Sequence, residues 1–319
     1  MEQYEALMRD KTYVELPMGR TVAEFLAVKR KRFTQNSMDA YESTLNAFAR
    51  KFAYHELEQF EGIKGAELVE RWLDDEWGKR KASTYNRHLA TMRSFFKFQK
   101  RRGRIKDNPM ELIDPAKEGE TERTAFTRDT AQRIIAAQDV VRDRIAMQLM
   151  LHYGLRRGGM LAIQFRHFDH VRRELTVFLK GGKVRALPIP EPAFWYELER
   201  LILESEAQPH HYLMQARWSN KRSEKAKPDK PMSPHGFHKF WYRCLAKAGV
   251  VAEGVTSGEK PHKARHSAGQ IILEQTGDLK LVQQTLMHKN ISTTADTYVN
   301  YDNPALAERL GRVWGTDDE

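Results

Sequence analysis

A polar, proline-containing segment divides this chain into two parts whose patterns of apolar residues differ. Residues 105–122 lie within the run RIKDNPMELIDPAKEGETER, whose two prolines and dense charge are typical of a linker between domains. Before the linker, apolar residues recur at helical spacing in four stretches, 21–33, 38–53, 66–77 and 83–103. After it, helical patterns around 128–138 and 140–153 precede two short apolar runs, 174–179 and 184–189, which predict a β-hairpin closed by Gly181 and Gly182.

These patterns predict a chain of two domains. We expect a short N-terminal extension over 1–19, a helical domain over 20–104, the linker over 105–122, and a second domain over 123–319. A tail helix is expected at about 303–314. The polar, lysine-rich run between Gln215 and Pro234 is interpreted as a surface loop or insertion.

Composition favours a nucleic-acid partner inside the cell. Lysine and arginine total 53 against 43 acidic residues, and the net charge of +10 attracts polyphosphates. The only cysteine, Cys244, excludes disulfides and cysteine-rich zinc modules. The N-terminus mixes charges, and no run of about 18 apolar residues occurs, so we expect a cytoplasmic protein without a signal peptide or membrane span.

Basic, imidazole and phenol side chains are concentrated near the C-terminus. Within about forty residues the chain places His262, Arg265, His266, His288, Tyr298 and Tyr301. A guanidinium binds two phosphate oxygens at once, and a phenol beside a proton acceptor can attack phosphorus. Upstream, Arg156 follows a Gly-Leu pair in LMLHYGLRRGGML, and Lys180 lies between the two strand-like runs. Together these residues predict a site that cleaves DNA.

This ordered set resembles the tyrosine recombinase (phage integrase) family. In that family an Arg after Gly-Leu, a Lys on a β-hairpin, His-x-x-Arg, a His or Trp, and a nucleophilic Tyr follow one another along the chain. The resemblance implies that the catalytic residues here are Arg156, Lys180, His262, Arg265, His288 and Tyr298. It implies a mainly α fold with a small β-sheet: a helical core-binding domain and a mixed α+β catalytic domain that close on DNA as a C-shaped clamp.

Several positions have rivals in the sequence. Arg157 competes with Arg156, Lys183 with Lys180, and Tyr301 with Tyr298, although the spacing from His288 to Tyr298 fits the family. His262 and His266 also stand at the i, i+4 spacing of zinc ligands, but no Glu follows His262. We therefore expect no metal and no cofactor.

One departure from the family pattern follows the first arginine. Gly158 and Gly159 stand where the family has Ser and an acidic residue. Because each glycine in a helix costs roughly 1 kcal/mol relative to alanine, we expect close backbone packing or an approach to DNA to offset the cost.

The DNA-binding residues and the partners are predicted less directly. The start of the 83–103 helix offers Lys81, Thr84, Asn86 and Arg87, and the hairpin offers Lys183; a merely solvated helix start is the alternative. The tail carries an apolar stripe of Leu306, Leu310, Val313 and Trp314. By resemblance, this stripe passes to a neighbouring protomer in a homotetramer on paired double-stranded DNA, while folding onto its own domain is the alternative.

The resemblance implies a site-specific recombinase that acts through a 3′-phosphotyrosyl intermediate. The first version is an integrase of a phage or mobile element, which could use a directionality factor. Only about twenty residues precede the first expected helix, so no additional arm-binding domain is expected. The alternatives are a Xer-like resolvase of chromosome or plasmid dimers, a type IB topoisomerase-like enzyme, and a DNA-binding protein without activity.

Overall fold

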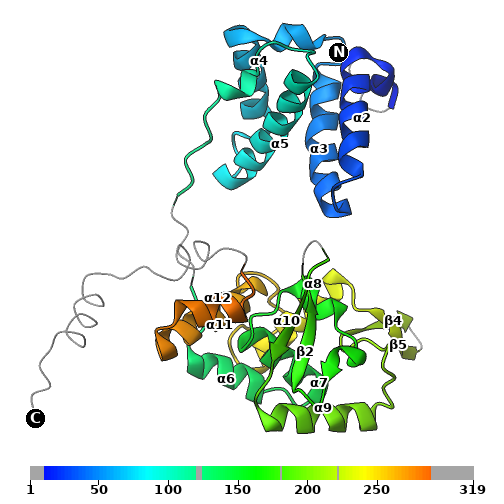
Figure 1. Cartoon of the computed structure of the whole chain (residues 1–319), viewed down its shortest axis with the longest axis vertical. Coiled ribbons are helices and arrows are strands. Elements are labelled where there is room, and N and C mark those ends of the chain that lie inside the picture. The colour runs from blue at the N-terminus through cyan, green and yellow to red at the C-terminus, as the bar shows by residue number, and fades with distance from the viewer. Residues whose placement is uncertain (1–10, 120–123, 180–181, 221–222, 289–319) are drawn as a thin grey trace, which may run out of the picture. The chain divides into compact units, whose positions relative to one another are not determined.

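The computed structural model describes residues 11–119, 124–179, 182–220 and 223–288. The chain forms two compact units, Met1–Thr121 and Glu122–Glu319, which are drawn in Figure 1. Within the described ranges, no helix combines the length and apolarity that crossing a bilayer requires. The mainly helical fold with small sheets that the sequence predicts is confirmed.

The first unit is entirely helical in its described part. Its elements are η1 (Lys11–Glu15), α2 (Pro17–Arg30), α3 (Gln35–Lys51), η2 (Leu57–Phe60), α4 (Gly62–Trp77), α5 (Ala82–Arg101) and η3 (Pro109–Glu111). Helix α2 begins four residues before the predicted stretch, because Pro17 occupies its first turn, where the missing N–H costs no hydrogen bond.

Aromatic side chains fill the core of this unit. Phe48 on α3 is fully buried and lies within 6.0 Å, centroid to centroid, of rings from three other elements, including Phe60, Trp72 and Phe95. Most of these pairs meet edge to face or tilted, the geometry that ring quadrupoles favour. The core therefore ties α3, α4 and α5 into one body.

The predicted linker is largely part of this unit. Ile105, Met110 and Ile113 are buried in the same core cluster. Asn108 caps η3 by accepting a hydrogen bond from the Met110 N–H. The charges and prolines of this segment are typical of a linker, but its apolar side chains pack into the core of the first unit.

The second unit surrounds a small antiparallel sheet with helices. The helical elements are α6 (Arg128–Ala136), α7 (Val141–Leu151), α8 (Arg157–Ala162), η4 (Phe165–His167), α9 (Pro192–Glu204), α10 (Pro234–Lys247), α11 (His262–Thr276) and α12 (Leu279–Thr285). The strands are β1 (Phe168–Asp169), β2 (Glu174–Phe178) and β3 (Val184–Pro188), in the order β1-β2-β3. The predicted hairpin is confirmed, with Leu175 opposite Leu187.

The prediction of a loop over Gln215–Pro234 is wrong. Strands β4 (Gln215–Asn220) and β5 (Ser223–Pro231) pair as a two-stranded antiparallel ribbon. Strand propensity in this lysine-rich run is low, so the signal was absent from the residue types. Backbone pairing satisfies the peptide groups regardless of side-chain polarity, and an irregularity between Gln215 and Ala216 accommodates the ribbon.

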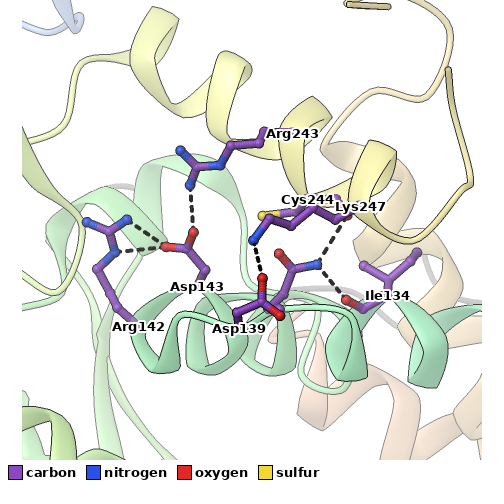
Figure 2. A network of polar contacts seen from close by, with 8 residues as sticks. Ile134, Asp139, Arg142, Asp143, Arg243, Cys244 and Lys247 are labelled. Carbon is purple, nitrogen blue, oxygen red and sulfur yellow. Dashed lines mark hydrogen bonds and ion pairs between the residues drawn. The ribbon is translucent and has the colours of Figure 1, made fainter. Parts of the chain in front are cut away.

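A polar network fastens α10 to α7 and to the connection that precedes α7 (Figure 2). Asp143 is buried, and its two carboxylate oxygens each pair with one arginine, Arg142 at 2.6 Å and Arg243 at 2.6 Å. Lys247 on α10 reaches Asp139 at 2.8 Å. Breaking a buried ion pair by removing one partner typically costs about 3–5 kcal/mol. Because α7 also packs against α6, α9 and α11, this network fixes α10 on the central helix of the unit.

Candidate active site

A buried arginine joins three segments at the centre of the predicted site. Arg265 on α11 is only 5% exposed. Its Nη1 donates to the carbonyl oxygen of Gly154 at 2.7 Å, and its Nη2 donates to that of Leu286. The guanidinium therefore fixes α11 to the turn that follows α7 and to the end of α12.

Gly154 is required by this arrangement. Its φ of +63° lies in the left-handed region, which favours glycine. A Cβ at this position would lie 2.4 Å from Leu286 Cδ2 and 3.3 Å from Arg265 Cγ. The turn thereby brings the backbone against Arg265 and sends Arg156 to the start of α8.

The predicted phosphate-binding arginines line one cavity of about 610 Å³. Arg156 precedes α8 as its N-cap residue and is exposed, and Arg265 supplies the inner wall. Arg157, the rival in the sequence, is the first residue of α8 and does not line this cavity. The remaining lining comes from β2 and the ends of α8 and α12, namely Leu155, Gly158, Gly159, Val177, Phe178, Leu179, Thr285, Leu286 and Met287.

His288 lies at the same place, after α12. Its backbone N–H donates to the Gln283 carbonyl at 3.0 Å, and the preceding Met287 has a φ of +54°. Burial, with smaller contributions from the positive charges of Arg265, Arg156 and His262, lowers the pKa of His288 to about 4. At neutral pH the imidazole is therefore uncharged and keeps one N–H for donation.

His262 approaches from the beginning of α11. It is the first residue of the helix, is exposed, and stands three residues before Arg265 on the same face. His262 is one of the groups that lower the pKa of His288, so the two imidazoles lie near each other. Arg156 is thus brought close to three predicted catalytic residues of the α11–α12 segment, His262, Arg265 and His288, which follow it more than about 100 residues later in the chain.

The other two predicted catalytic residues, Lys180 and Tyr298, lie outside the described residues, as does the rival Tyr301. Lys180 stands in the sequence between β2 and β3. The residues on either side of this connection are paired, because the Leu179 N–H donates to the Lys183 carbonyl at 2.7 Å. Lys183 itself is exposed at the start of β3. On the other side of the hairpin, Phe178 and Leu179 line the cavity.

Gly158 and Gly159 are not explained by packing within the protein. A Cβ at either position would meet nothing within 4 Å. The expectation of close backbone packing inside the protein is therefore wrong. Both glycines line the cavity, so they leave open space beside Arg156, and approach of DNA there stays a prediction.

The predicted DNA-binding residues on α5 differ in their surroundings. Lys81 and Arg87 are exposed and Thr84 is half-buried at the start of the helix. Asn86 instead hydrogen-bonds through both amide atoms to Ala116 of the linker segment. Sequence reasoning could not find this pairing, because Asn86 and Ala116 are thirty residues apart and the linker carries no recognisable partner pattern.

A buried histidine supports Arg87. The Arg87 Nη2 donates to His88 Nε2 at 3.4 Å, while His88 Nδ1 is hydrogen-bonded to Thr44 at 2.7 Å. The ring stacks on Trp77 with centroids 3.8 Å apart. Burial, with a smaller contribution from Arg87, lowers the pKa of His88 to about 4, so it remains a neutral acceptor for the guanidinium.

One cluster among the described residues has metal-ligand chemistry, at His210, His211 and Asp229. However, His211 Nδ1 accepts a hydrogen bond from the Gln208 N–H at 3.0 Å. The neutral ring then carries its proton on Nε2, which faces Asp229 at 3.6 Å and where a metal ion would bind. The cluster is therefore a hydrogen-bonded surface group.

Comparison with known proteins identifies the class. Residues 124–304 match the phage integrase family, and residues 23–103 match the N-terminal SAM-like domain of phage integrases. The first match spans more than half of the chain, so this chain belongs to the phage integrase family. The resemblance predicted from the sequence is confirmed.

Particular relatives are tyrosine recombinases. Tyrosine recombinase XerC of Salmonella typhi is 30% identical over 228 residues, covering 69% of each chain. XerC of Vibrio parahaemolyticus is 27% identical over 300 residues, covering 89% of this chain and 88% of the relative. The solved structure of a lambda integrase(75–356) dimer bound to a COC′ core site has a TM-score of 0.66 at 18% identity, covering 89% of this chain and 97% of that chain. This last likeness concerns the fold.

We predict that Gly154→Ala and Gly158→Ala have opposite consequences. Gly154→Ala forces a left-handed backbone on alanine beside Arg265 and Leu286, so the free energy of unfolding should fall by about 1–3 kcal/mol. Gly158→Ala meets no neighbour and lies in a helix, so stability should stay equal or rise by up to about 1 kcal/mol. Urea denaturation of the full chain measures both; equal losses for the two variants would contradict this assignment.

Proposed function

We propose that this protein is a site-specific DNA recombinase that cuts and rejoins strands through a covalent link to Tyr298. The observation that carries the proposal is that Arg156 and Arg265 line one cavity, with a neutral His288 close enough for both arginines and His262 to affect its pKa. Such a set stabilises the extra negative charge that a phosphodiester acquires when it becomes five-coordinate. Membership of the phage integrase family supports the same chemistry.

Each described residue has a defined task in this reaction. Arg265 is held rigidly by two carbonyl groups, so its guanidinium is preorganised, and Arg156 enters the same cavity from the α8 start. Preorganised donors cost no reorganisation when charge develops on the non-bridging oxygens. The neutral His288 donates an N–H to the phosphate, and this hydrogen bond persists at neutral pH because the pKa of His288 is about 4.

The covalent step exchanges one phosphoester for another. The phenol oxygen of Tyr298 attacks phosphorus, its proton passes to His262, and the P–O bond to the 5′ oxygen breaks. Lys180 supplies the proton that makes this leaving group a 5′ hydroxyl. The strand remains attached through a 3′-phosphotyrosyl ester, and attack by a 5′ hydroxyl reverses the step. Since the ester is conserved, rejoining requires no nucleotide cofactor.

The biological setting has two candidates. We propose an integrase of a phage or mobile element as the first. A resolvase of chromosome or plasmid dimers is the second, and it is favoured by the relatives named XerC. Sequencing the junctions formed in cells that contain the gene's own element would separate the two, because only an integrase joins that element to the chromosome.

We predict that Tyr298→Phe abolishes covalent trapping and leaves DNA binding intact, since only the attacking oxygen is lost. The test uses a duplex that the wild-type protein selects from a random pool, with a nick that lets the cut fragment diffuse away. Wild-type protein should remain on the 3′ side, as denaturing gels would show. Tyr301→Phe is the matched control and should still be trapped; the reverse pattern would transfer the nucleophile to Tyr301.

We predict that Arg87→Ala weakens binding to the selected duplex and flattens its salt dependence by about one unit, as expected for one lost phosphate contact. Lys97→Ala is the matched control, because Lys97 is exposed on α5 away from the first turns. Binding titrations at several salt concentrations measure the slope. Equal slopes for Arg87→Ala and the wild type would remove Arg87 from the DNA contact.

We further propose that active protein assembles as a homotetramer on paired DNA, with the tail segment passed between protomers. The tail lies outside the described residues, so the support is its apolar stripe, Leu306, Leu310, Val313 and Trp314. Burial of such side chains stabilises by roughly 1.5–3 kcal/mol each.

Truncation after Asn303 should therefore spare half-site binding but lose cooperative filling of the full site and recombination. Truncation after Gly315 keeps the stripe and should behave like the wild type. Gel-shift and two-site plasmid assays measure these properties. Recombination at the full-length rate by the shorter protein would refute exchange of the tail.

A further inference from the structure

The segment between the two units is fastened at both ends to functional helices. On the first unit, the amide of Asn86 on α5 pairs with the backbone of Ala116: Nδ2 donates to the carbonyl at 2.9 Å, and Oδ1 accepts from the N–H at 2.8 Å. The same Nδ2 donates to the Glu118 carboxylate at 2.9 Å. Among the residues described up to Gly119, Glu118 is thus the last one held on this side, and its partner Asn86 is the neighbour of Arg87 in the chain.

Helix α5 makes a second contact with the linker, at Ile113, which precedes Ala116 in the chain. Arg93 Nη2 donates to the Ile113 carbonyl at 2.5 Å, and the Ile113 side chain is buried. The chain from Ile113 to Glu118 thus runs along α5, held at Ile113 by Arg93 and at Ala116 and Glu118 by Asn86.

On the second unit, the chain is fastened to the helix that carries Arg265. The Phe126 N–H donates to Ser267 Oγ at 2.7 Å, and both residues are buried. The Lys263 ammonium lies 4.6 Å from the centroid of the Phe126 ring. Lys263 and Ser267 are one helical turn apart, so Phe126 is held on a face of α11 about 200° around the helix from Arg265.

We infer that Asn86 is a positioning residue that sets the length of the tether between the DNA-binding helix α5 and the catalytic helix α11. From Glu118 to Phe126 there are 126 − 118 = 8 Cα steps, which span at most about 29 Å when fully extended. Without the Asn86 contacts the free chain would begin at Ile113, and 126 − 113 = 13 steps would reach about 47 Å.

The tether length has a measurable consequence for DNA binding. This inference rests on the proposed function, because it requires both units to bind one duplex. Once one unit is bound, and for a tether whose r.m.s. length matches or exceeds the span that it bridges, the effective concentration of the other unit falls roughly as the −3/2 power of the tether length. Lengthening the tether from 8 to 13 steps should then weaken half-site binding about twofold, equally for every DNA sequence.

The experiment compares Asn86→Ala with a direct change of tether length. Hydrogen exchange of the full-length protein without DNA should show faster exchange over residues 113–118 in Asn86→Ala, with α5 unchanged. Glu118→Gln is the matched control, because its side chain still offers an acceptor to Asn86. Unchanged exchange over 113–118 in Asn86→Ala would overturn the anchoring, whatever the protein does to DNA.

Binding to the selected duplex tests the tether. A five-residue Gly-Ser insertion after Gly119 also gives 8 + 5 = 13 steps, so it should match the about twofold loss of Asn86→Ala, at an unchanged salt slope. Both changes together give 13 + 5 = 18 steps and should reduce affinity about 3.4-fold. A change of base preference in Asn86→Ala, or a loss that the insertion fails to reproduce, would assign Asn86 to direct DNA contact. Absence of binding by the wild-type protein would instead refute the proposed function.

Discussion

The site depends on keeping one arginine charged and buried. Arg265 is taken out of water, and an isolated buried cation is strongly unfavourable unless oxygen atoms replace its hydration. The carbonyl groups of Gly154 and Leu286 do this, and each belongs to a different segment. The positions of the turn after α7 and of the end of α12 are therefore fixed by their hydrogen bonds to the Arg265 guanidinium. Gly154 is the residue that permits so close an approach, because it has no side chain and adopts a positive φ.

The same constraint gives the cavity its electrostatic character. Arg156 and Arg265 are cations, and among the described lining residues none is acidic. His288 responds to this field and to burial by losing its proton, so it contributes a hydrogen-bond donor without adding a further charge. Gly159 also lines the cavity, and a Cβ at this position would meet nothing within 4 Å, so the glycine leaves open space beside Arg156. A cavity with these properties favours an anionic group over a neutral one.

The sequence predicted the helices, the hairpin and the residues of the candidate site, but it did not predict the β4–β5 ribbon or the contacts of Asn86 with the linker. The four helical stretches and the β2–β3 hairpin follow from apolar periodicity, whereas Arg156, His262, Arg265 and His288 were singled out by the resemblance to a known family. The β4–β5 ribbon could not be predicted, since its residue types disfavour strands and the pairing depends on the backbone. The role of Asn86 was also hidden, because an amide at a helix start suits DNA and a linker backbone equally well.

The contacts that hold the linker on α11 lie on a different face of that helix from Arg265. Phe126 is held by Lys263 and Ser267, on the side of α11 away from Arg265, so a pull on the chain would act on the back of the helix. The Arg265 contacts to two carbonyl groups would resist rotation of α11 under that pull. At the other end, Asn86 adjoins Arg87, whose guanidinium is oriented by the neutral His88. A short stretch of chain therefore joins two helices, and each end of this stretch is hydrogen-bonded to one of them: to α5 through Asn86, and to α11 through Ser267.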